Sequence, residues 1–217
     1  MFKGAAVPEG SASDLSTPAR IRDAAIVVFG EEGFGVGVRT IAKAAGVSPG
    51  LVNHHFGSKD GLREVCDEHV RAVIRAAKTE YVQQPSPNST LKALAEIEEF
   101  APYTAYLMRS FQAGGTLMTS LFDQMRSDVE TYLEIGIAAG TLRRPRDVSA
   151  TANYLAVQNG GGFLFFLQLY AARHEGKLDF RKALREYADQ MMLPAVEAST
   201  HGLFADSTVL DSLLAEM

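Results

Sequence analysis

Apolar residues recur at helical spacing along most of this 217-residue chain. The clearest run follows Thr17-Pro18, where apolar side chains stand at positions i, i+3, i+4, i+7 and i+8: Ile21, Ala24, Ala25, Val28 and Phe29. This spacing places all of them on one face of an α-helix. No segment alternates apolar and polar residues for long enough to predict a β-strand. The sequence therefore predicts an all-α fold of about nine or ten helices.

Turn-forming residues divide the helical pattern into three parts. Residues 1–16 are small, polar and interrupted by glycine and proline, which predicts a mobile N-terminal tail. Residues 17–63 hold short helical patterns, and the last of these continues as a connector to about residue 82. Residues 83–217 are expected to form a second, C-terminal helical domain. Its helical patterns cover about 89–99, 101–113, 115–139, 147–173, 179–200 and 206–216.

A helix-turn-helix is predicted at residues 38–56, which read VRTIAKAAGVSPGLVNHHF. Gly46 suits the left-handed backbone that ends a helix. Ser48 then offers a side-chain oxygen to the free amides of the next helix. Small residues such as Ala42 let the two helices cross closely. Held by its neighbours, the second helix can enter the major groove of DNA while flanking residues meet phosphates.

The charge distribution agrees with an anionic partner for this segment. The chain as a whole has a net charge of −5, which at first argues against nucleic acid. Residues 36–63, however, hold four basic side chains (Arg39, Lys43, Lys59 and Arg63) against the single acidic Asp60. A polyanion responds to this local excess of positive charge rather than to the total.

Residues 17–63 resemble the DNA-binding domain of the TetR family of bacterial transcriptional regulators. The matching residues are Phe29, Gly33-Phe34, Ile41-Ala42, Ala45-Gly46-Val47-Ser48, His55-Phe56, Ser58-Lys59 and Leu62. The resemblance implies a homodimer with two N-terminal DNA-binding heads. It also implies that residues 83–217 form a helical ligand-binding and dimerisation domain, a body that binds a small ligand and makes the dimer interface. Two residues depart from the pattern of the family. Asn53 stands where the family commonly has a DNA-contacting tyrosine, and Gly37 stands where a Thr or Ser commonly starts the first helix of the helix-turn-helix.

The resemblance and the helix-turn-helix geometry together predict the DNA contacts. Phosphate contacts are expected from Arg39, Thr40, Lys43 and Lys59. Contacts in the groove are expected from the outer face of the second helix: Ser48, Pro49, Gly50, Asn53 and His54. His55 and Phe56 are expected in the core, because they share a stripe with Leu51 and Val52.

Methionine and aromatic side chains gather in the C-terminal part of the chain. With a few polar atoms among them, such side chains suit a broad apolar pocket, and a plain packed core is the alternative interpretation. The residues expected to bind a ligand are Tyr103, Tyr106, Met108, Phe111, Gln112, Met118, Phe122, Met125, Tyr154, Gln158, Asn159 and Phe163.

Three consecutive glycines, Gly160, Gly161 and Gly162, lie inside a long helical pattern. Each costs roughly 1 kcal/mol in a helix interior, so a close approach by another helix or by a ligand is expected to offset the loss. A local kink without functional meaning is the alternative. Because the family builds its dimer from the last long helices, we expect an interface at Gly160, Gly161, Gly162, Phe166, Tyr187 and Met191.

These features favour a ligand-responsive repressor. The expected protein binds a palindromic operator in double-stranded DNA as a homodimer, and a small apolar effector releases it from the operator. By analogy with the family, the genes that it controls are expected to be efflux or catabolic genes. The alternative is a helical small-molecule binding protein whose helix-turn-helix reads no DNA. Neither an enzymatic activity nor a cofactor, metal or membrane partner is expected. The single Cys66 and the lack of a secretory signal predict a cytoplasmic location.

Overall fold

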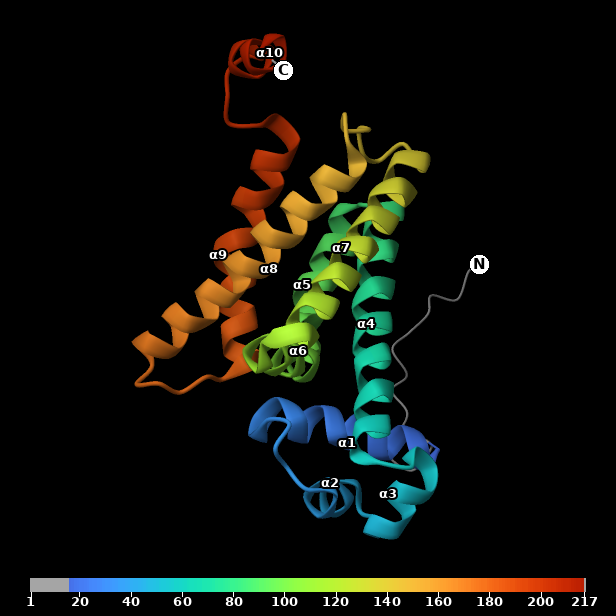
Figure 1. Cartoon of the computed structure of the whole chain (residues 1–217). Coiled ribbons are helices and arrows are strands. Elements are labelled where there is room, and N and C mark those ends of the chain that lie inside the picture. Colours follow the sequence, from blue (N-terminus) through green and yellow to red (C-terminus); the bar gives the residue numbers. More distant parts are fainter. Residues whose placement is uncertain (1–15, 217) are drawn as a thin grey trace.

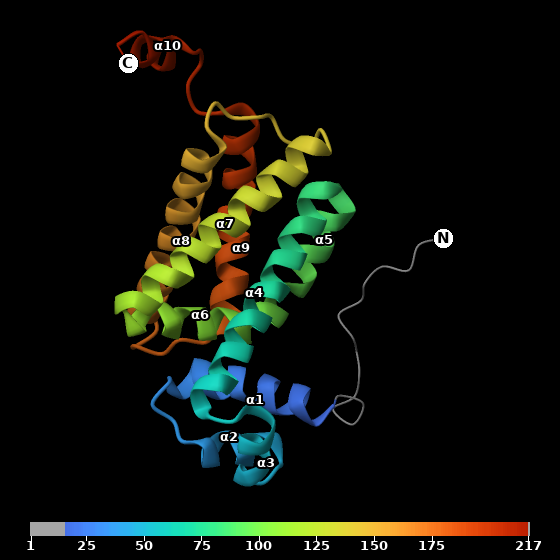
Figure 2. The same cartoon turned by 45° about the vertical axis from the view of Figure 1, so that its right-hand side comes forward.

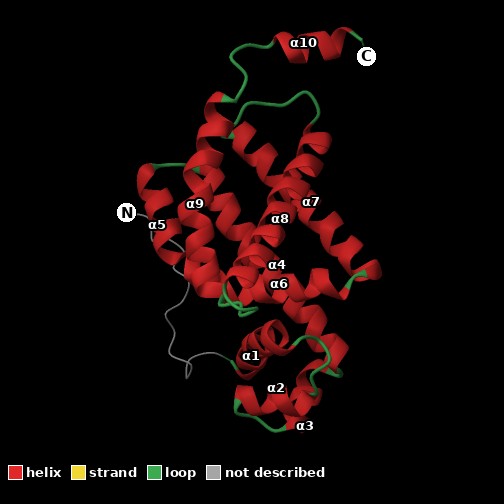
Figure 3. Cartoon of the chain, turned by 90° about the vertical axis from the view of Figure 1, so that its left-hand side faces the viewer, coloured by secondary structure: helices red, strands yellow, loops and turns green. Residues whose placement is uncertain are grey.

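The structure, a computed structural model, describes residues 16–216 apart from the side chains of Thr116 and Leu117. Over these residues the chain forms ten α-helices and one 3-10 helix, without a strand (Figures 1 and 3). The predicted all-α fold is therefore confirmed. The tail predicted for residues 1–16 lies outside the described residues, except for Ser16.

The helices end close to where the sequence predicts. The head consists of α1 (Thr17–Glu32), α2 (Val38–Ala45) and α3 (Pro49–Phe56), and α4 (Lys59–Gln83) rises from it into the body (Figure 1). The body contains α5 (Pro87–Glu96), η1 (Ile97–Phe100), α6 (Ala101–Ala113), α7 (Gly115–Ala138), α8 (Val148–Arg173), α9 (Phe180–His201) and α10 (Thr208–Ala215). The glycine run stays within α8, which continues unbroken to Arg173.

One apolar core unites the three head helices with the first half of α4. Ile21 of α1, Ile41 of α2, Val52 of α3 and Leu62 of α4 are fully buried together. Short helices such as α2 and α3 are marginal alone, so this shared core is what stabilises them.

The head is joined to the body mainly through α1 and α6. Arg109 of α6 donates from Nε to the carbonyl oxygen of Gly30 (3.1 Å) and from Nη2 to that of Glu31 (2.9 Å). These oxygens lie at the C-terminal end of α1, where carbonyls lack partners within their own helix. Gly30 also permits the close approach, because a Cβ there would lie 2.9 Å from the Cβ of Ala105. The body therefore holds the end of a head helix directly.

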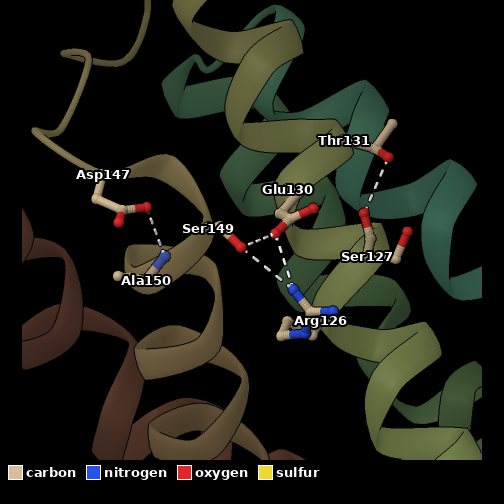
Figure 4. Close-up of polar contacts among 7 residues, drawn as sticks. All are labelled: Arg126, Ser127, Glu130, Thr131, Asp147, Ser149 and Ala150. Atoms are coloured by element: carbon tan, nitrogen blue, oxygen red, sulfur yellow. Dashed lines mark hydrogen bonds and ion pairs between the residues drawn. The ribbon is translucent and has the colours of Figure 1, made fainter.

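In the body, α7 and α8 pack against each other around Val129, Leu133, Ala152 and Ala156. Polar contacts fix the two helices at the start of α8 (Figure 4). Arg126 of α7 donates to Glu130 on the next turn (3.0 Å) and to Ser149 of α8 (3.2 Å). Asp147 caps α8 by accepting from the amide of Ala150 (2.9 Å). The last helix, α10, stands apart at the end of the molecule opposite the head (Figures 1 and 2).

Candidate DNA-binding surface and ligand cavity

The turn between α2 and α3 is built by the two residues that the sequence singles out. Gly46 ends α2 in the left-handed conformation (φ 67°, ψ 36°). The Ser48 hydroxyl oxygen accepts from the amide of Leu51 at 3.2 Å and so caps α3. From α1, Arg20 donates to the carbonyl oxygen of Ala45 (3.1 Å) at the end of α2. These contacts fix the angle between the two helices, and both local predictions are confirmed.

The residues predicted to contact DNA lie on the outside of the head. Arg39 and Lys43 are exposed on α2, where Thr40 is half-buried; the exposed residues of the turn and of α3 are Ser48, Pro49, Gly50, Asn53 and His54. In Figure 2, α2 and α3 form the end of the molecule farthest from the body. The structure thus brings the predicted residues onto one accessible end, and their DNA contacts stay a prediction.

The expectation for His55 is wrong. Val52 alone on α3 is fully buried, and Phe56 is half-buried against the head core. His55, in contrast, is exposed. The head core meets α3 on the side of Val52 and Phe56, which leaves His55 facing outward.

Lys59 has a structural role that the sequence does not reveal. Its ammonium group donates to the carbonyl oxygens of Phe34 (2.9 Å) and Val36 (3.3 Å), in the loop between α1 and α2. An ammonium carries three donors, so one remains for a phosphate. Nearby, the Arg63 guanidinium lies 3.6 Å above the Phe34 ring. Both cations therefore stabilise the loop that leads into the helix-turn-helix.

The body contains a cavity of about 440 Å³, open to solvent on one side, that is suited to a small molecule. This volume is within the range of about 300–1,000 Å³ found for ligand pockets. Five predicted ligand residues line it: Met108, Phe111, Met125, Asn159 and Phe163. Gly160 and Tyr187, which the sequence assigns to a dimer interface, line it as well. The walls come from α4, η1, α6, α7, α8 and α9, so distant parts of the chain meet there.

The other predicted ligand residues lie elsewhere. Tyr106 is 1% exposed in the head core, where its hydroxyl donates to Asp67 of α4 at 2.6 Å. Tyr103 packs against the same core, and Phe122 packs between α7 and α8. Met118, Tyr154 and Gln158 are exposed on the body. Gln112 lines a separate cleft between α1, α6, the end of α8 and the start of α9. These residues correct the sequence-based set, because the packing of each helix turns them away from the cavity.

The contribution of α4 to the cavity was not evident from the sequence. Ile74, Arg75 and Lys78 lie on its walls. Arg75 pairs with Asp128 of α7 at 3.2 Å. Burial lowers the pKa of Lys78 and raises the pKa of Tyr132 in the same cavity to about 12. The i, i+4 spacing of Ile74 and Lys78 is the one signal that points to a shared face of α4.

The residues predicted for a dimer interface differ in accessibility. Nothing lies within 4 Å of a Cβ built at Gly161 or Gly162, and Met191 is 40% exposed. Phe166 is buried within the body, 6% exposed, and makes an edge contact with Tyr187. The glycine run is thus open at Gly161 and Gly162, whereas a Cβ at Gly160 would lie 3.5 Å from Cε of Met125.

Comparisons with known proteins identify the family. Residues 21–66 match the model of the bacterial regulatory proteins of the tetR family, and residues 98–205 match the tetracyclin repressor-like C-terminal domain. The chain is 50% identical to the HTH-type transcriptional regulatory protein RaaS of Mycobacterium tuberculosis over 94% of both chains. The chain belongs to the TetR family, and it is a transcriptional regulator with a helix-turn-helix DNA-binding head and a C-terminal ligand-binding domain.

Two solved structures share the fold. One is a putative TetR-family regulator from Rhodococcus sp. (TM-score 0.57, 20% identity, 84% of this chain and 97% of that chain). The other is FadR of Bacillus subtilis in complex with stearoyl-CoA (TM-score 0.55, 17% identity, 86% of this chain and 99% of that chain). Within residues 16–216, the structure has no helix that is long and apolar enough to cross a bilayer. The same residues contain no cluster of three potential metal ligands.

Proposed function

We propose that this regulator is a ligand-responsive repressor. It binds a palindromic operator as a homodimer through α2 and α3, and a small apolar effector in the body cavity releases it. The observation that carries the proposal is the position of α6 between the cavity and the head. Leu107, Met108 and Phe111 of α6 line the cavity, whereas Ala105 and Arg109 contact the end of α1.

This position gives the effector a physical route to the DNA-binding surface. An effector that favours one placement of α6 also favours one placement of α1, because Arg109 holds two carbonyl oxygens at the end of α1. The head core joins α1 rigidly to α3. DNA affinity then falls by the same factor by which the ligand prefers the released conformation. FadR of Bacillus subtilis, a structure of the same fold, holds stearoyl-CoA, which is consistent with a ligand-binding body.

Exposed apolar side chains on the last long helices support the homodimer. Tyr154 and Phe165 of α8 are 60% and 62% exposed, and Leu193 of α9 is 75% exposed. Apolar side chains gathered on one region of a body mark an interaction surface. Gly161 and Gly162 add an open backbone that a second copy can approach closely. Dimerisation spaces two α3 helices for the half-sites of a palindrome. Because the protein has to reach its operator DNA, the proposal also implies a cytoplasmic location.

The test is a fluorescence-anisotropy titration of the purified chain against the DNA that flanks its own gene, across a salt series. Scrambled DNA of equal length competes. We expect the protein to prefer its operator over scrambled DNA and to bind with two protomers per site. The logarithm of the binding constant should fall linearly with the logarithm of the salt concentration. Lys43→Ala should weaken binding to all sequences and reduce the salt slope by about one, while Asn53→Ala should reduce the preference for the operator. Lys177→Ala, a charge change in the exposed loop before α9, is the matched control.

Two outcomes would contradict the proposal. Equal competition by scrambled DNA at every flanking site would favour the helical binding protein whose helix-turn-helix reads no DNA. Operator binding that no apolar ligand from a broad panel weakens would remove the effector from the proposal. The target genes, efflux or catabolic, follow from mapping the bound sites on the chromosome.

A further inference from the structure

The cavity in the body has an apolar wall and a charged wall. The apolar wall includes Phe100, Leu107, Phe111, Phe163 and Leu164, which come from η1, α6 and α8. The charged side chains of the lining are Arg75, Lys78 and Asp128. Two of these side chains lie one helical turn apart on α4, so the charge is confined to one side.

Only one of the three charges lacks a counter-ion within the described part of the chain. Arg75 and Asp128 form an ion pair, with Nη1 and Oδ1 3.2 Å apart. Lys78 has no such partner, and burial is the sole cause that lowers its pKa. Lys78 is nevertheless exposed to solvent. A position on the wall of a wide cavity explains both observations, because water enters the lumen while surrounding protein weakens the hydration of the ammonium.

The lining therefore carries two cations and one anion, an excess of one positive charge. An anion that binds beside the unpaired ammonium gains a charge-assisted hydrogen bond, and the adjacent apolar wall partly shields that pair from water. The hydroxyl of Tyr132 does not supply this anion, because the pKa of the phenol is raised to about 12 and the group stays neutral at physiological pH.

We propose that the effector of this cavity is an amphiphile with a single anionic group, a carboxylate or a phosphate, that pairs with Lys78 while its hydrocarbon part lies against the apolar wall. The inference rests on the proposed function and narrows its effector from any apolar molecule to a chain with one charged end. Lys78 supplies the charge-assisted hydrogen bond, and the aromatic and leucine side chains of η1, α6 and α8 supply the apolar contact.

The experiment measures binding of four probes of equal chain length to the full-length protein without DNA, by isothermal titration calorimetry. The probes are dodecanoate, dodecyl phosphate, dodecanol and dodecylamine. We expect at least one anion to bind about 10-fold or more tightly than the alcohol, and the amine to bind more weakly still. The comparison of dodecanoate with dodecyl phosphate identifies which anion the cavity prefers.

Three variants test the role of the lysine. Lys78→Met keeps the length and removes the charge, so the preference for the anion over the alcohol should disappear. Lys78→Arg keeps the charge and should retain most of the preference. Lys92→Met removes an exposed lysine of α5 that pairs with Glu80, and it should behave as the wild type. Circular dichroism of each variant confirms that it is folded.

The inference is overturned if no probe binds, if the alcohol binds as tightly as the anions, or if Lys78→Met retains the wild-type preference. The proposed function fails in a different way. If the anions bind through Lys78 and do not weaken operator binding, the effector site stands and the release mechanism does not. If an uncharged ligand releases the operator and the anions fail to bind, the repressor stands and the assignment of Lys78 does not.

Discussion

Replacing Gly30 by alanine tests the contact that joins head and body. The added Cβ would lie 2.9 Å from the Cβ of Ala105 and 3.1 Å from the backbone nitrogen of Tyr106. Ordinary contacts begin near 3.4 Å, so α1 must move away from α6 by several tenths of an ångström. Overpacking of this kind costs about 1–3 kcal/mol, whereas alanine gains up to about 1 kcal/mol in helix propensity. The shift also stretches the two hydrogen bonds from Arg109, so destabilisation should prevail.

We expect a net loss of about 1–2 kcal/mol, which for a domain of this size lowers Tm by about 2–8 °C. Thermal unfolding at fixed protein concentration measures it. Gly50→Ala is the matched control, because its Cβ would meet nothing closer than Ser48 Oγ at 3.9 Å. Ala105→Gly should cost less in the Gly30→Ala background than in the wild type. A Gly30→Ala variant as stable as the wild type, or additive effects of the two substitutions, would refute the close contact.

Three further predictions concern buried polar groups. Tyr106→Phe leaves Asp67 without its 2.6 Å donor and should cost about 1–3 kcal/mol in urea unfolding. Burial raises the pKa of Asp67, and the hydrogen bond from Tyr106 partly offsets this by favouring the carboxylate. Without that bond the pKa of Asp67 in the folded state rises further, so the variant should lose more stability at pH 7 than near pH 4. Cys66, fully buried with its pKa raised to about 12, should not react with a thiol reagent at pH 8 until urea unfolds the chain, and rapid labelling of the native protein would contradict this. Lys59→Met should destabilise the head by about 1–2 kcal/mol through the lost carbonyl contacts, whereas the exposed Lys43→Met should not; equal stability of the two variants would argue against the loop-holding role.

The DNA-binding head could be predicted almost entirely from the sequence, because its signals are local. The αL end at Gly46 and the cap at Ser48 depend on backbone conformation and on side chains within three residues. Helix boundaries in the body were equally predictable, since caps such as Asp147 act on the first turn that follows them. The role of Lys59 was hidden, because its carbonyl partners lie 25 and 23 residues away in the chain.

The composition of the cavity was less predictable than its existence. Methionine and aromatic residues indicated an apolar pocket in the body, and Met108, Phe111 and Phe163 do line one. Tyr106, two residues before Met108, points instead into the head core. Residues so close on one helix face different neighbours, and only the packing of α6 against both α1 and the other body helices decides which side chain meets the lumen.

The sequence by itself determined the helices, the helix-turn-helix and the family, because periodicity, caps and turn residues act over a few positions. Tertiary structure alone decided which faces of α4, α6, α7, α8 and α9 turn inward and which charge remains without a partner there. Arg75 and Lys78 are equivalent cations in the sequence, three residues apart on one helix. They differ because Asp128, carried to Arg75 by the packing of α7 on α4, neutralises one of them and leaves the other facing the cavity.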